Sequence, residues 1–140
     1  MKKQPESAYV ITGYILFLGI IVFLIYALFR ATRSEIEERN INIIVILIFF
    51  CLGVTVSGFG SWQLVLSHAW QIGKSRALHL LPFHFSAGMI SFIIVSIIIL
   101  KYLSSIISIF LIIPMEWIAP LPGIMLSAFL VSRALKKAIP

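Results

Sequence analysis

The feature that most constrains this chain is the alternation of long apolar runs with short charged clusters. Each run extends for about twenty residues or more, which is the length that an α-helix needs to cross roughly 30 Å of hydrocarbon. The charged residues gather between the runs, where such helices would enter and leave a bilayer. This pattern predicts an all-α integral membrane protein.

The composition agrees with this fold class. Hydrophobic residues make up 61% of the chain and charged residues only 11%. Soluble domains are roughly 25% charged, so this chain has too little charge to cover a water-facing surface. At 140 residues, the chain is predicted to form one membrane domain, residues 1–140.

We predict four transmembrane helices in an antiparallel bundle. The first apolar run follows two lysines, but it is too long for a signal peptide and no small-residue cleavage site follows it. It is therefore assigned as a span. Pro82 favours a helix start at the third span, because proline fits the first helical turn. The predicted spans are residues 8–29, 41–66, 82–100 and 106–132.

Prolines interrupt the last span or the loop before it, within Pro114–Gly123. In one register, a helix covering 106–132 is broken near its middle. In the other, the third helix continues further and a short fourth helix covers 118–135. We favour the first register because it keeps Lys101 out of the hydrocarbon, whereas the second places Glu116 at an interface. Both registers give four helices.

The basic residues predict the orientation. An even number of spans places both termini and the second connection on one side, and seven basic residues lie there: Lys2, Lys3, Lys74, Arg76, Arg133, Lys136 and Lys137. The other side holds Arg30, Arg33 and Arg39. Because basic loops stay inside the cell, both termini are expected to be cytoplasmic. The net charge of +6 is scattered over the helix ends, so we expect a lipid bilayer and other membrane subunits as partners, and no nucleic acid.

The three histidines lie around the junction of the second and third spans. His68 and His84 fall at the same membrane end of adjacent antiparallel helices, and His79 is an alternative to His68. Two imidazoles there are candidate axial ligands for haem b, or partners for a quinone head group. His79 and His84 match no metal-ligand motif, so we assign no metal site. Histidine is also tolerated at the headgroup level without any ligand.

Two further sets of residues carry candidate roles. Gly53, Ser57 and Ser61 recur every four residues and are predicted to form a helix-packing face, because small residues let two helices approach closely in lipid. A flat cofactor against the glycines is the alternative. Glu116, with Lys101 as partner, is a candidate ion or proton site. The alternative places Glu116 in an interfacial loop.

The chain contains no aspartate, no phosphate-binding loop and no nucleophile motif. We therefore assign no catalytic residue and expect no catalytic activity of the chain on its own. The expected function is a small membrane subunit that packs within a larger complex, of the respiratory or another electron-transfer kind. The alternatives are a redox subunit that binds b-type haem or quinone, and a small homo-oligomeric transporter or channel that uses Glu116.

Overall fold

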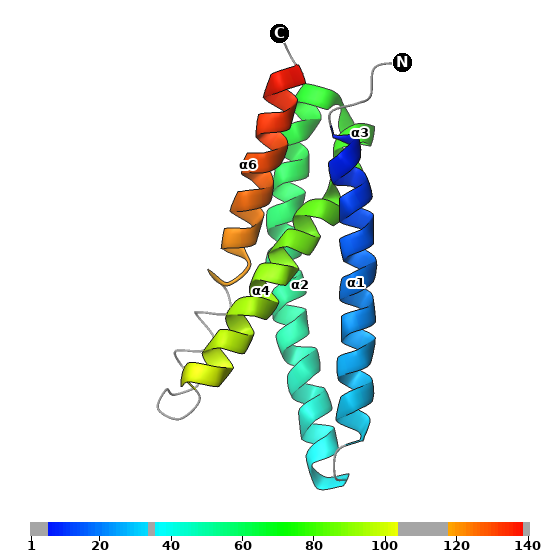
Figure 1. Ribbon diagram of the computed structural model, residues 1–140, viewed down its shortest axis with the longest axis vertical. Helices are drawn as coiled ribbons and strands as arrows, with labels where there is room; N and C mark the ends of the chain where they lie inside the picture. Colours follow the sequence, from blue (N-terminus) through cyan, green and yellow to red (C-terminus); the bar gives the residue numbers. More distant parts are fainter. Residues whose placement is uncertain (1–5, 34–35, 104–117, 139–140) are drawn as a thin grey trace.

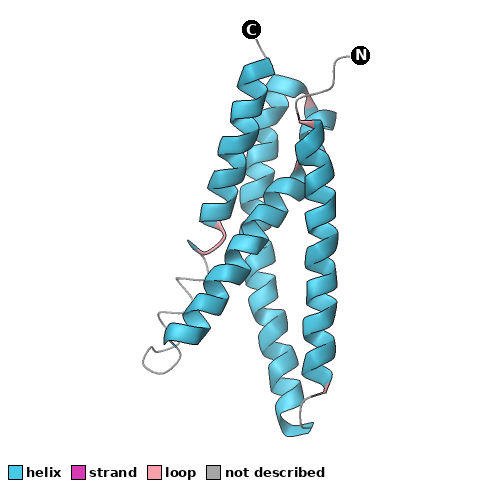
Figure 2. Cartoon of the chain, viewed as in Figure 1, coloured by secondary structure: helices cyan, strands magenta, loops and turns pink. Residues whose placement is uncertain are grey.

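The computed structural model describes residues 6–33, 36–103 and 118–138, and these parts of the chain are helical, without strands (Figures 1 and 2). In a bilayer the backbone hydrogen bonds must be satisfied inside the chain, which a helix achieves. The helices are α1 (Ser7–Thr32), α2 (Ile36–Ile72), α3 (Lys74–Leu78), α4 (Leu81–Leu103) and α6 (Leu121–Ala138).

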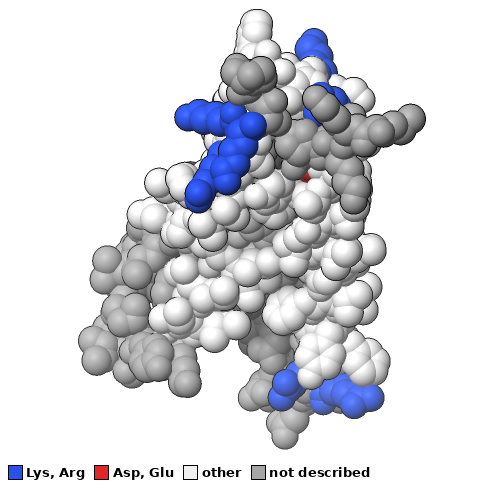
Figure 3. Space-filling model, turned by 45° about the horizontal axis from the view of Figure 1, so that its top comes forward, with Lys and Arg blue, Asp and Glu red and all other residues white. Residues whose placement is uncertain are grey.

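Among the described residues, three helical stretches are long and apolar enough to cross a membrane: Ser7–Thr32, Phe50–Ile72 and Lys74–Ile98. The charged side chains agree with this. In the view of Figure 3, the Lys and Arg side chains gather at the two ends of the molecule, and the surface between them is almost free of charge. The all-helical membrane class predicted from the sequence is supported, while the count of four spans remains a prediction.

The predicted last span, 106–132, lies partly outside the described parts of the chain, and its described part overlaps α6. Helix α6 begins at Leu121 and continues to Ala138; residues 104–117 lie outside the described parts. Proline is accommodated in the first helical turn, where it removes no intrahelical hydrogen bond, so Pro122 permits a start at Leu121. The basic residues Lys136 and Lys137 in the last turn favour continuation because cations stabilise a helix C-terminus.

Helix α4 is the central element of the bundle, because α1, α2 and α6 all pack against it. In Figure 1, α4 crosses the bundle obliquely with α1 and α6 on either side. The start of α1, the short helix α3 and the end of α6 lie together at one end of the bundle, which we call the α3 end. The α3 end holds the apolar core formed by Leu80, Phe83, Val131 and Leu135.

Two glycines bring neighbouring helices onto the backbone of α4. A Cβ atom added at Gly13 of α1 would lie 2.5 Å from the backbone nitrogen of Phe83. A Cβ atom added at Gly123 of α6 would collide with the carbonyl group of Ala87. Close approach of this kind maximises dispersion contacts, which hold helices together in lipid. The two contacts fix α1 and α6 on either side of the histidine-bearing turn of α4.

Candidate functional site

A column of small and polar residues follows one face of α2. Gly53, Ser57, Ser61 and His68 are buried on this face. Their spacings of four, four and seven residues keep them on one side of the helix. A Cβ atom on Gly53 would meet the ring of Phe92 at 2.7 Å, and one on Gly88 would meet the hydroxyl of Ser57 at 2.9 Å. The α2 face therefore lies directly against α4.

His68 lies within α2, whereas the second predicted span, 41–66, ends before it. That expectation was wrong because the segment from Ser67 to Ile72 contains neither glycine nor proline, and the helix continues through it. The break comes at Gly73, which has φ +89°, a conformation that glycine adopts without strain. As a result, the His68 side chain is buried rather than exposed at the membrane surface.

His68 and His84 contact each other in the interior. Their ring centroids are 5.2 Å apart and their planes are 22° from parallel, so the rings are stacked. His84 is completely buried and His68 is 3% exposed. Antiparallel packing of α2 and α4 thus brings together two titratable side chains that are 16 residues apart in the sequence.

A hydrogen bond to Ser127 of α6 bears on the tautomer of His84. The Nδ1 atom of His84 lies 2.8 Å from the hydroxyl oxygen of Ser127. Ser127 donates its single hydroxyl hydrogen to the carbonyl oxygen of Ile124, at 2.8 Å. With that hydrogen on the Ile124 carbonyl, the Ser127 oxygen accepts a hydrogen bond from His84 Nδ1. In neutral His84, the remaining nitrogen, Nε2, is then a hydrogen-bond acceptor.

Several polar atoms of this region have no hydrogen-bond partner among the described residues. They are His68 Nε2, His84 Nε2, Ser57 Oγ and Ser86 Oγ, all of them buried. Leaving a buried polar group unsatisfied costs about 1–3 kcal/mol, and most such groups in proteins are paired with protein or with ordered water. The buried column therefore keeps hydrogen-bonding capacity that no described residue uses.

The arrangement of the two rings does not fit a haem held between them. Two axial imidazoles must point a ring nitrogen at the iron from opposite faces of the macrocycle. The rings of His68 and His84 instead lie nearly face to face, which leaves no room for a macrocycle between them. Within the described parts of the chain, no group of three or more His, Cys, Asp or Glu side chains could hold a metal ion.

The other candidate residues lie elsewhere. His79 follows α3 and is exposed, with Nδ1 3.2 Å from the hydroxyl of Tyr14, so it does not join the buried pair. Lys101 belongs to the last turn of α4. Glu116 lies outside the described residues.

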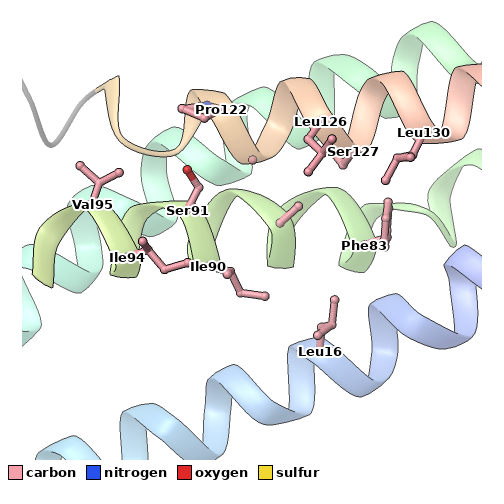
Figure 4. Close-up of a pocket in the computed structure, with 12 residues that line it drawn as sticks. Leu16, Phe83, Ile90, Ser91, Ile94, Val95, Pro122, Leu126, Ser127 and Leu130 are labelled. Carbon is pink, nitrogen blue, oxygen red and sulfur yellow. The ribbon is translucent and has the colours of Figure 1, made fainter. Parts of the chain in front are cut away.

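An apolar cavity of about 430 Å³ lies between α1, α4 and α6 (Figure 4), and its lining includes Ser127, the hydrogen-bond partner of His84. Leu16 of α1 faces it from one side, while Leu126 and Leu130 of α6 face it from the other. The polar side chains in its lining are Ser91 and Ser127. Ser91 donates its hydroxyl hydrogen to the carbonyl oxygen of Ala119 at 2.6 Å. Like Ser127, it can therefore only accept a further hydrogen bond.

Ser127 and Ser91 were not predicted from the sequence. Ser127 lies among Ile124, Val131 and Leu135 on the buried stripe of α6. A single polar residue within an apolar helical stripe could have marked it, because a buried hydroxyl requires a hydrogen-bond partner.

In comparisons with known proteins, no protein family, no curated protein and no solved structure matches the chain.

Proposed function

We propose that the protein binds the hydroxyl-bearing head group of a lipid-soluble quinol, the reduced form of a quinone, within the membrane. The observation that carries the proposal is the buried His84, bonded to Ser127 at the wall of the apolar cavity. Pockets that are mostly apolar and contain a few convergent polar groups are the usual form of small-molecule sites.

The polar groups near the cavity favour the reduced form of such a ligand. Ser91 and Ser127 line the cavity and donate their hydroxyl hydrogens to backbone carbonyl groups, and Ser127 is the hydrogen-bond partner of the buried His84. The site therefore supplies acceptors. A quinol supplies two O–H donors, whereas a quinone has only acceptor oxygens. The apolar lining suits the ring and the first part of an isoprenoid tail.

The test compares ligands that differ only in their hydroxyl hydrogens. Calorimetric titration of the protein in nanodiscs would use a short-chain quinol and its di-O-methyl ether. We expect the quinol to bind about tenfold more tightly, which corresponds to about 1.4 kcal/mol. The His84→Phe variant keeps a flat ring but removes the hydrogen-bond partner of Ser127 at the cavity wall, so its preference for the quinol should weaken.

Thr55→Val serves as the matched control, because Thr55 is exposed on α2 and bonds to the carbonyl of Cys51 in its own helix. This variant should keep the wild-type preference. Equal affinity of wild-type protein for the quinol and its ether, or no saturable binding of either, would refute the proposal.

The exterior supports a second proposal, that the protein is a small subunit of a larger membrane assembly, of the electron-transfer kind expected from the sequence. Large aliphatic side chains are exposed on the outer half of α4, including Ile94, Ile97 and Ile98, where α4 leans away from α1 in Figure 1. A partner helix could pack in that space.

Native gel electrophoresis in mild detergent should then show a species larger than the monomer, and the Ile97→Trp variant should lose this species. A monomer alone would contradict this second proposal.

A further inference from the structure

A second, polar cavity lies at the α3 end, where α1 begins. It has a volume of about 260 Å³ and is lined by Glu6, Ser7, Val10, Ile11, Arg76 and His79. The Nε atom of Arg76 donates a hydrogen bond to Oε1 of Glu6. This ion pair joins the residue before α1 to helix α3. The cavity lies at the boundary of a predicted span and is separate from the histidine pair.

The Glu6 carboxylate has an unused oxygen. The side chain is 2% exposed, and its Oε2 atom has no hydrogen-bond partner among the described residues. A carboxylate accepts hydrogen bonds through both oxygens, so Oε2 requires a donor. A cationic N–H group is the strongest donor for it, because charge-assisted hydrogen bonds are roughly twice as strong as neutral ones.

Arg76 provides the complementary half of the site. Its side chain is 40% exposed, and only Nε is directed to Glu6 in the bond described above. The two terminal nitrogens of a guanidinium form a fork that matches the oxygens of a phosphate. The cavity thus places a carboxylate oxygen, which accepts hydrogen bonds from a cation, beside a guanidinium group, which donates them to an anion. A zwitterion therefore complements the cavity.

The surface of α1 below the cavity is apolar. Ile11, Ile15, Leu18 and Val22 are each more than 60% exposed, and their spacing of three or four residues puts them in one stripe along the helix. Val10 and Ile11 also form part of the cavity wall. A molecule whose head group occupies the cavity can lay a hydrocarbon chain along this stripe.

We propose that this cavity binds a phospholipid with a primary ammonium head group, namely phosphatidylethanolamine. The ammonium donates to Oε2 of Glu6, the phosphate accepts from Arg76, and an acyl chain lies along the stripe of α1. Phosphatidylcholine lacks N–H donors on its ammonium, and phosphatidylglycerol lacks the cation. This site is independent of the proposed quinol site.

The test measures how affinity depends on head-group methylation. Native mass spectrometry would follow retention of phosphatidylethanolamine, its mono- and dimethyl derivatives and phosphatidylcholine, all with the same acyl chains. Affinity should fall as N–H donors are removed, with about a tenfold loss for phosphatidylcholine. This series needs only the wild-type protein, so it stays decisive even where a variant fails to fold.

Two variants then assign the site. Glu6→Gln removes the carboxylate charge and should abolish the preference for the ethanolamine lipid over the choline lipid. Arg133→Gln removes an exposed charge from α6 at the same end and should leave the preference unchanged. Equal affinity for all four lipids would overturn the proposal, as would an unchanged preference in Glu6→Gln. Binding of chain-free phosphorylethanolamine as tight as that of the lipid would overturn the lipid assignment.

Discussion

At the scale of single residues, the hydrogen bond between His84 and Ser127 joins α4 to α6. Ser127→Ala removes the acceptor and leaves the N–H group at Nδ1 of His84 buried without a partner. We expect unfolding free energy to fall by about 1–3 kcal/mol, measured by chemical denaturation in mild detergent. Thr55→Ala removes an exposed hydroxyl bonded within its own helix and should have a much smaller effect. Equal losses of unfolding free energy in the two variants would show that the buried hydrogen bond contributes no more to stability than the exposed one.

The ion pair between Glu6 and Arg76 makes stability depend on pH. Burial disfavours the charged form of Glu6, but the hydrogen bond from Arg76, a backbone hydrogen bond of Glu6 itself and the positive charge of Arg76 outweigh it. The pKa of Glu6 therefore lies below its usual value of 4.5. A carboxyl group with a lowered pKa stabilises the folded state above its ordinary pKa, and this contribution is lost as the pH falls through the lowered value.

Thermal unfolding of wild-type protein and Glu6→Gln across pH 7 to about pH 3 tests this effect. The wild-type protein should be the more stable at neutral pH, and the difference should shrink as acid protonates Glu6. A difference that stays constant over this range would show that the charge of Glu6 does not stabilise the fold.

At the scale of helices, the contact between α1 and α4 depends on the absence of a side chain at Gly13. A Cβ atom there meets the backbone of Phe83, which cannot move aside as a flexible side chain could. Gly13→Ala should therefore destabilise the protein by about 1–3 kcal/mol, the usual range for overpacking.

Gly19 provides the matched control in the same helix, because nothing lies within 4 Å of a Cβ atom added there. Gly19→Ala should leave stability unchanged or raise it, since alanine favours the helix over glycine by about 0.5–1 kcal/mol. Unfolding followed by circular dichroism compares the two. Similar effects at both positions would contradict the close packing of α1 on α4.

The sequence predicted some helices better than others for physical reasons. The cores of α1 and α4 were predicted closely because each coincides with a long apolar run. The end of α2 was missed because Gln63, His68 and Gln71 lower its hydropathy without breaking its backbone. The meeting of His68 with His84 was anticipated because adjacent helices run antiparallel. The hydrogen bond between His84 and Ser127 was not predicted, because it joins residues 43 positions apart. It depends on how α6 is rotated about its own axis, which the pattern of apolar residues does not define.

At the scale of the whole molecule, the basic residues predict which end faces the cytoplasm. With Cys51 replaced, single cysteines at Ser75 and Glu37 can be labelled by a membrane-impermeant reagent. Ser75 lies in α3 and Glu37 in the first turn of α2, at opposite ends of the bundle. We expect Ser75→Cys to be labelled only from the cytoplasm and Glu37→Cys only from outside, because basic segments remain inside. The reverse pattern would invert the orientation.

The contact of Gly13 with Phe83 also indicates how far the histidine pair lies from the α3 end. Gly13 comes seven positions after Glu6, which is about 10 Å along a helix at 1.5 Å per residue. His84, next to Phe83 in the sequence, therefore lies about 10 Å below the ion pair of Glu6 and Arg76. If the ion pair marks the edge of a 30 Å hydrocarbon layer, roughly 20 Å would remain on the far side. In that placement the histidine pair would lie much closer to the aqueous compartment at the α3 end than to the other. We then expect any exchange between the pair and water to take place from the α3 side.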